Sequence, residues 1–118
     1  MINKDYFRQT RILDGGMGQE LLARGMKPNS TLWSANAILD ENYHQLVLDT
    51  HIDFIKAGAE IIVTTTFATR HRRLKENNLL DKFEYLNQKA GEIAQLAKKK
   101  YPNTFVAGGI PPQNSTYE

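Results

Sequence analysis

Apolar and polar positions alternate along the chain in blocks that predict strands and helices in turn. The longest apolar block, residues 59–67, is rich in β-branched side chains and lacks polar alternation, which is typical of a parallel strand buried on both faces. A shorter block at residues 12–14 predicts a buried first strand that ends at Asp14. A third block, residues 104–109, predicts the last strand of this set.

Apolar residues with helical spacing fill the segments between the predicted strands. The predicted helices and helical turns span residues 18–24, 32–39, 41–57, 70–77 and 82–100. Gly25 and Gly58 suit the left-handed position that ends a helix. Asp40 is a candidate N-cap, and Asp81 with Glu84 has the spacing of a capping box. Strands that alternate with helices predict right-handed crossovers and a parallel sheet, so the fold class is α/β.

Polar or glycine-rich residues follow each predicted strand, at 14–16, 64–66 and 108–109. Because the carboxyl ends of parallel strands lie on one edge of a sheet, we expect these loops to converge. The glycines after Asp14 allow a sharp turn and the close approach of a ligand to backbone N–H groups. The sequence therefore predicts a small-molecule site at this edge.

Composition narrows the classes of function. The 118 residues are 41% hydrophobic and 24% charged with a net charge of +2, as in an ordinary soluble domain, and nothing indicates a nucleic-acid or membrane partner. The basic stretch at residues 70–75 is better interpreted as a solvated helix face than as a phosphate or nucleic-acid site. No signal peptide or membrane span is evident, so we expect a cytoplasmic location. The absence of cysteine excludes disulfides and thiolate metal sites within this chain.

Several stretches, in order, resemble the N-terminal part of the homocysteine S-methyltransferase family, which includes betaine–homocysteine methyltransferase. They are residues 13–21, 32–35, 54–59, 64–69 and 106–112. The resemblance implies a (β/α)8 barrel, a fold that needs about 250 residues. Residues 1–118 would then be the N-terminal portion of a single barrel domain, with its first two βα units and third strand. We interpret the sequence as truncated in the loop after that strand.

The resemblance also implies a zinc-dependent enzyme. A methyl group would pass from an onium donor, such as S-methylmethionine, S-adenosylmethionine or betaine, to the homocysteine thiol to give methionine. The resemblance places the three cysteines that hold zinc beyond Glu118, so no metal ligand or catalytic residue is expected here and this chain alone is expected to be inactive. The sequence identifies neither the methyl donor nor the oligomeric state.

This segment would contribute the residues that bind the amino-acid part of homocysteine. By the resemblance, the substrate-binding residues are Asp14, Gly15, Gly16, Met17, Glu20, Thr64 and Thr66, with Gln19 next in rank. Asp14 would pair with the homocysteine ammonium. The N–H groups of residues 15–17 would suit a carboxylate, and the two threonines would add hydroxyl hydrogen bonds.

Other interpretations stay open at this point. Trp33 either lines the donor site, because aromatic faces attract onium groups, or packs in the core. The family often has threonine where Gln19 stands, asparagine where Thr65 stands and a residue other than glycine at Gly109, which leaves the donor preference open. The alternative functions are a non-catalytic α/β module for amino-acid binding or assembly, and another (β/α)8 enzyme.

Overall fold

The structure, a computed structural model, describes residues 2–113 and is built around a small parallel sheet. β1 (Ile61–Val63) pairs in parallel with β2 (Phe105–Ala107), and Ile62 lies opposite Val106. Leu13 forms an isolated parallel bridge to Ile61, so the first segment lies beside β1. A mixed α/β fold with a parallel sheet is thus confirmed. The end of the predicted loop, residues 114–118, lies outside the described residues.

The extended segments are shorter than predicted. The first forms only its single bridge, and Ile12 and Leu13 are 55% and 56% exposed, so the expectation of a buried first strand is wrong. This segment lies at the sheet edge with β1 as its neighbour among the described residues, and its apolar side chains stay uncovered. The predicted second strand, residues 59–67, continues no further than Val63, because the Thr66 N–H turns back to the Thr64 carbonyl at 2.8 Å.

Helices occupy the segments between the strands, as expected. They are α1 (Met17–Ala23), α2 (Asn36–Leu39), α3 (His44–Lys56), α4 (His71–Glu76) and α5 (Phe83–Lys100). Short 3-10 segments are η1 (Lys4–Arg8), η2 (Trp33–Ala35), η3 (Glu41–Tyr43) and η4 (Leu80–Lys82). Within residues 2–113, no helix combines the length and apolarity needed to cross a bilayer.

The predicted helix caps have mixed outcomes. Gly25 and Gly58 have φ values of 105° and 120°, in the left-handed region that suits the end of a helix. The Asp40 carboxylate accepts the Asn42 N–H and so caps η3, which runs directly into α3. The capping box at Asp81 is wrong, because Asp81 lies inside η4 and α5 begins without a side-chain cap.

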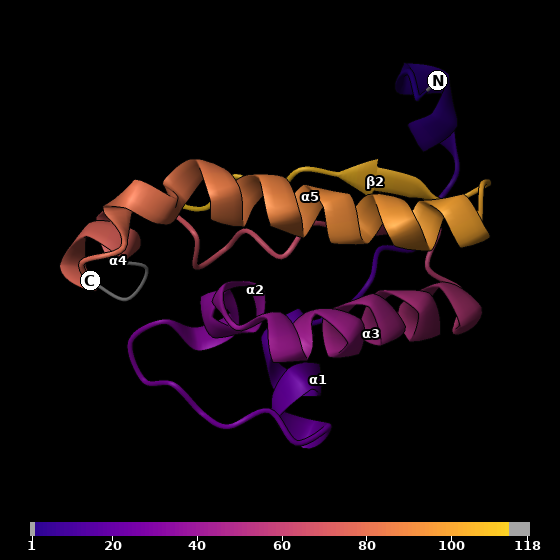
Figure 1. The fold of residues 1–118 in the computed structure, drawn as a ribbon. Helices are drawn as coiled ribbons and strands as arrows, with labels where there is room; N and C mark the ends of the chain where they lie inside the picture. Colours follow the sequence, from indigo (N-terminus) through magenta and orange to yellow (C-terminus); the bar gives the residue numbers. More distant parts are fainter. Residues whose placement is uncertain (1, 114–118) are drawn as a thin grey trace.

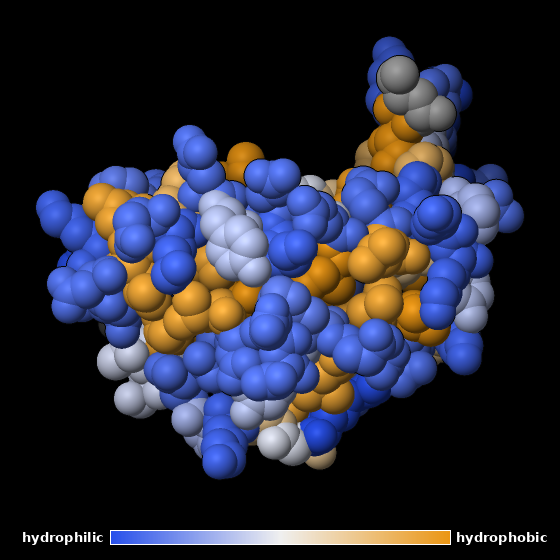
Figure 2. All heavy atoms as spheres, viewed as in Figure 1, coloured by the Kyte–Doolittle hydropathy of each residue, from blue (hydrophilic) through white to orange (hydrophobic). Residues whose placement is uncertain are grey.

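Two long helices carry the core. α3 packs on β1, α5 packs on β2, and the two helices contact each other (Figure 1). The largest cluster of buried apolar side chains joins α1, α2, α3, α4 and α5, and its fully buried members include Leu21, Ile38, Val47, Leu74 and Leu86. Figure 2 shows that apolar patches also remain on the surface that α3 and α5 share.

The N-terminal segment covers the amino end of the sheet. Tyr6 in η1 packs edge-on against Phe105, the first residue of β2, with ring centres 5.1 Å apart. The Arg11 guanidinium stacks on Tyr6 at 3.9 Å from the ring centre and donates through Nε to the Tyr6 carbonyl at 2.8 Å. Loops lie at the carboxyl end of the sheet, where the functional site is expected.

The turn after Asp14 leaves little room for a side chain at its first position. A Cβ on Gly15 would lie 2.9 Å from Cε1 of Phe54 in α3, whereas a Cβ on Gly16 would meet nothing within 4 Å. We expect Gly15→Ala to reduce the free energy of unfolding by about 1–3 kcal/mol, as overpacking does. Gly16→Ala, the control, removes the glycine N-cap of α1 without a steric clash and should cost less, about 0.5–1 kcal/mol. Urea denaturation measures both, and equal effects would contradict the proposed contact with Phe54.

Candidate functional site

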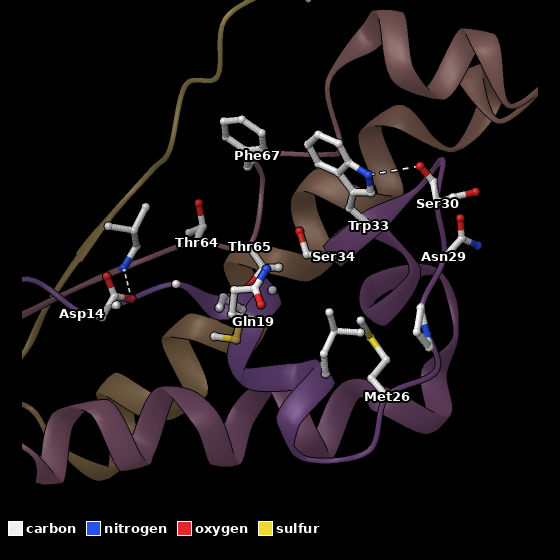
Figure 3. Close-up of a pocket in the computed structure, with 17 residues that line it drawn as sticks. Asp14, Gln19, Met26, Asn29, Ser30, Trp33, Ser34, Thr64, Thr65 and Phe67 are labelled. Carbon is white, nitrogen blue, oxygen red and sulfur yellow. Dashed lines mark hydrogen bonds between the residues drawn. The ribbon is translucent and has the colours of Figure 1, made fainter. Parts of the chain in front are cut away.

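An open pocket of about 750 Å³ lies at the carboxyl end of β1 (Figure 3). Its walls come from the turn at residues 14–19, from the loop between α1 and η2, and from residues 63–67 after β1. These segments are far apart in the sequence and meet because their strands are parallel neighbours. The pocket therefore lies at the edge of the sheet where the loops after the strands were predicted to converge.

Asp14 is fixed at one end of the pocket. Its carboxylate oxygen Oδ2 accepts the Val63 N–H at 3.0 Å, and its own backbone N–H donates to the Ile61 carbonyl at 3.1 Å. Burial raises the pKa of the Asp14 carboxyl above its ordinary value of 3.8, while the hydrogen bond from Val63 acts in the opposite direction. A half-buried carboxylate held in this way favours a cationic partner.

A ring of hydrogen bonds joins the ends of the second and third strands. The Gly109 N–H donates to Thr64 Oγ1 at 3.2 Å, and Thr66 Oγ1 donates to the Gly109 carbonyl at 2.8 Å. The two threonine hydroxyls are 3.0 Å apart. Because the Thr66 proton is used by Gly109, Thr64 is the donor between them. A Cβ at Gly109 would lie 3.1 Å from Thr66 Oγ1, so glycine suits this ring.

Thr65 is a residue of the site that the sequence did not single out. It is 5% exposed and lines the pocket, and its hydroxyl has no hydrogen-bond partner within residues 2–113. A buried hydroxyl without a partner at a pocket wall indicates a polar ligand or water. The resemblance indicated Thr64 and Thr66 and gave Thr65 only as a departure from the family. The chain turns after Val63, and Thr65 lines the pocket as well.

The other predicted residues divide into two groups. The residues that line the pocket are Asp14, Gly15, Gly16, Met17, Gln19 and Thr64. Thr66 and Glu20 are not among them. Glu20 instead pairs with Arg24 one helical turn later at 3.1 Å, and Arg24 also pairs with Asp53 of α3 at 2.8 Å. Glu20 thus joins α1 to α3 through Arg24. The substrate contacts of all these residues stay predictions.

Trp33 lies in the pocket wall at the end away from Asp14 (Figure 3). Its indole Nε1 donates to the Ser30 carbonyl at 3.1 Å, and its ring lies nearly parallel to Phe67, with centres 6.3 Å apart and an angle of 8°. Its backbone φ is +50°, which is rare for a bulky side chain and is held by the surrounding structure. Of the two interpretations of Trp33, the geometry favours a place in the site.

The described residues do not fit a zinc site. No group of three or more histidine, cysteine, aspartate or glutamate side chains lies close enough within residues 2–113 to hold a metal ion. The whole chain lacks cysteine. His44 Nε2 donates to the Ile38 carbonyl at 2.7 Å, and His51 is fully buried in α3. The described pocket lining consists of one carboxylate, hydroxyl and amide side chains, and apolar and aromatic side chains.

Comparison with known proteins gives the family. The family model of the homocysteine S-methyltransferases matches residues 11–118. The chain belongs to the homocysteine S-methyltransferase family. The match includes the pocket residues from Asp14 to Phe67.

Individual relatives support the assignment. The chain is 31% identical over 104 residues to homocysteine S-methyltransferase 2 of Zea mays. This alignment covers 87% of this chain and 30% of the relative. It is 35% identical over 91 residues to selenocysteine Se-methyltransferase of Brassica oleracea var. italica, covering 76% of this chain and 26% of the relative. The chain thus spans less than a third of these relatives.

A solved structure of the same family has the same fold over this region. The metallated form of the homocysteine methyltransferase MmuM from Escherichia coli superposes with a TM-score of 0.78 at 28% identity. The superposition covers 93% of this chain and 41% of that protein. The homocysteine S-methyltransferase fold therefore contains the arrangement described here as one part of a larger structure.

Proposed function

We propose that this chain forms the homocysteine-binding part of a homocysteine S-methyltransferase, which transfers a methyl group from an onium donor to the homocysteine thiol to give methionine. The observation that carries the proposal is the Asp14 carboxylate, half-buried at the pocket and fixed by the Val63 N–H. Its remaining lone pairs suit the α-ammonium of an amino acid in a charge-assisted hydrogen bond.

Candidate donors for the carboxylate of the amino acid lie elsewhere in the pocket wall. The Thr65 hydroxyl is buried, lines the pocket and has no partner in the part of the chain that the structure describes. Rotation of the Thr65 side chain toward the pocket would let a carboxylate oxygen accept the proton of that hydroxyl. Residues 15–17 of the turn line the same pocket, and their backbone N–H groups would be further donors. Together with Asp14, these groups would fix both charged ends of the amino acid and direct its side chain into the pocket.

We infer that the chain is the first portion of a (β/α)8 barrel, residues 1–118 of one homocysteine-binding domain. The parallel order of the three strand segments and the superposition on MmuM support this. Further strands beside Leu13 would cover its exposed side chain.

The metal of the proposed enzyme is zinc. When bound, zinc would favour the thiolate form of homocysteine. Because the described residues do not fit a zinc site, its ligands belong to other residues, and the chain's own part is to bind and orient the amino acid. The aromatic rings of Trp33 and Phe67 lie at the far end of the pocket, where an onium methyl donor would be attracted to their faces.

Isothermal titration calorimetry with a matched pair of ligands tests the proposal. L-Homocysteine and 4-mercaptobutanoate share a thiol and a carboxylate, but only the former carries an ammonium group. We expect homocysteine to bind at least tenfold more tightly. Equal affinities, or no binding of homocysteine, would overturn the proposal. If the protein were a non-catalytic binding module, the two affinities would be the same as those expected here. Adding zinc and an onium donor to the full-length protein would then give no methyl transfer.

A further inference from the structure

The wall of the pocket carries a single charged side chain. Of the described residues that line the pocket, only Asp14 is charged, and no lysine, arginine or histidine is among them. The other polar side chains of the lining are neutral: Gln19, Asn29, Ser30, Ser34, Thr64 and Thr65. Because one carboxylate is the only formal charge of this lining, the field inside the pocket favours a cation and disfavours an anion.

Two guanidinium groups lie near the pocket but outside its lining. The Arg73 Cζ atom is 4.1 Å from the centre of the Trp33 ring. The Arg70 Cζ atom is 5.6 Å from the centre of the Phe67 ring. Both rings lie at the end of the pocket away from Asp14 (Figure 3). The arginines therefore offer no counter-charge within the lining to a carboxylate that is held beside Asp14.

The two charged groups of an amino acid cannot be separated in the pocket. They are bonded to the same carbon atom, so the carboxylate must lie near Asp14 whenever the ammonium group contacts that residue. The two carboxylates then repel each other, and the ligand carboxylate also loses part of its water. The neutral donors of the lining, such as the Thr65 hydroxyl and the Gln19 amide, bind a carboxylate less strongly than a guanidinium does. Gain and cost for the carboxylate therefore nearly cancel.

We propose that the pocket binds primary aminothiols as a class, and that the carboxylate of homocysteine adds little to the affinity. This ligand class rests on the proposed function, because it uses the same contact between Asp14 and an ammonium group. The neutral donors orient the carboxylate of homocysteine, while the charge of Asp14 supplies most of the affinity for the charged end of the ligand.

Two analogues of homocysteine each lack one charged group and keep the thiol chain. 4-Mercaptobutanoate lacks the ammonium group, and 3-aminopropane-1-thiol lacks the carboxylate. In calorimetric titration of the unaltered chain, we expect 3-aminopropane-1-thiol to bind within about threefold of the affinity of homocysteine, whereas 4-mercaptobutanoate binds at least tenfold more weakly. A larger loss for 3-aminopropane-1-thiol, or no binding of either amine, would overturn the proposal.

An Asp14 variant tests whether its charge sets this preference. Asp14→Asn keeps an oxygen for the Val63 N–H, and it removes both the attraction for an ammonium group and the repulsion of a carboxylate. We expect 3-aminopropane-1-thiol to bind at least tenfold more weakly to this variant, and 4-mercaptobutanoate to bind about threefold more tightly. A purely structural role of Asp14 would weaken both ligands alike. Unchanged or weaker binding of 4-mercaptobutanoate would therefore overturn the role of the charge.

Asp81→Asn is the matched control. It removes the charge of an exposed carboxylate in η4, outside the pocket lining, and should leave the affinities for both analogues unchanged. Misfolding of Asp14→Asn would not hide the answer, since the two analogues already test the unaltered chain.

Different results would contradict the proposed function and the ligand class. Homocysteine that binds no more tightly than 4-mercaptobutanoate would contradict the proposed function. Tight binding of homocysteine with weak binding of 3-aminopropane-1-thiol would contradict only the ligand class. Tight binding of 3-aminopropane-1-thiol without binding of homocysteine would support an aminothiol site and contradict the proposed function.

Discussion

Asp14→Ala is expected to weaken homocysteine binding by about 2–4 kcal/mol, because it leaves the ammonium group of the ligand desolvated without a counter-charge. This corresponds to roughly a 30- to 1,000-fold rise in the dissociation constant. Calorimetric titration at neutral pH measures the change. Because burial raises the pKa of Asp14, the affinity of the unaltered chain should also begin to fall at a higher pH than for an exposed aspartate.

Two further variants separate the charge of Asp14 from its structural contact. Asp14→Asn keeps an oxygen that can accept the Val63 N–H but removes the charge, so it should lose homocysteine affinity with little loss of stability. Asp81→Ala removes an exposed carboxylate in η4 and should leave the affinity unchanged. Homocysteine binding that survives Asp14→Asn would remove the Asp14 charge from the account of the site.

Acidification from pH 7 to pH 4 is expected to destabilise the fold by about 3 kcal/mol through His51 alone. His51 is fully buried in α3, and neither ring nitrogen has a hydrogen-bond partner within residues 2–113. Burial lowers the pKa of His51 from 6.5 to about 4, since the charged ring is disfavoured there. The unfolded chain therefore binds a proton first, and stability is lost as the pH falls from about 6.5 to about 4.

The measurement is urea denaturation across this range for the chain and for His51→Leu. Asp14 acts in the opposite direction, because its raised pKa lets the folded state take up a proton before the unfolded state does. The difference in the free energy of unfolding between the two proteins isolates the effect of His51. His51→Leu should become increasingly more stable than the unaltered chain as the pH falls. His71→Gln, at an exposed position in α4, is the control for replacing a histidine elsewhere in the chain. Parallel curves for His51→Leu and the unaltered chain would contradict the account.

Features set by neighbouring residues in the sequence were predictable. Gly25 and Gly58 end their helices because only nearby backbone geometry decides a left-handed cap. The parallel direction of the strand segments followed from their alternation with helices, and the convergence of the loops after them followed from that direction. Local chemistry and connectivity are therefore sufficient to bring the strand ends together.

Features that depend on distant partners were not predictable. Leu13 is exposed because coverage at a sheet edge depends on which strand lies beyond it, and the apolar character of the residue does not reveal this. Glu20 turns to Arg24 because an ion pair one helical turn away, shared with α3, competes with the pocket. Thr65 lines the pocket where the chain turns after Val63, and the predicted strand over residues 59–67 did not include that turn.

The structure of the chain bound to L-homocysteine tests the central claim most directly. The account predicts that the amino nitrogen lies about 3 Å from the Asp14 carboxylate, with the ligand carboxylate near the Thr65 hydroxyl and the backbone of residues 15–17. An amino acid bound elsewhere, or bound in this pocket with its ammonium group turned away from Asp14, would contradict it.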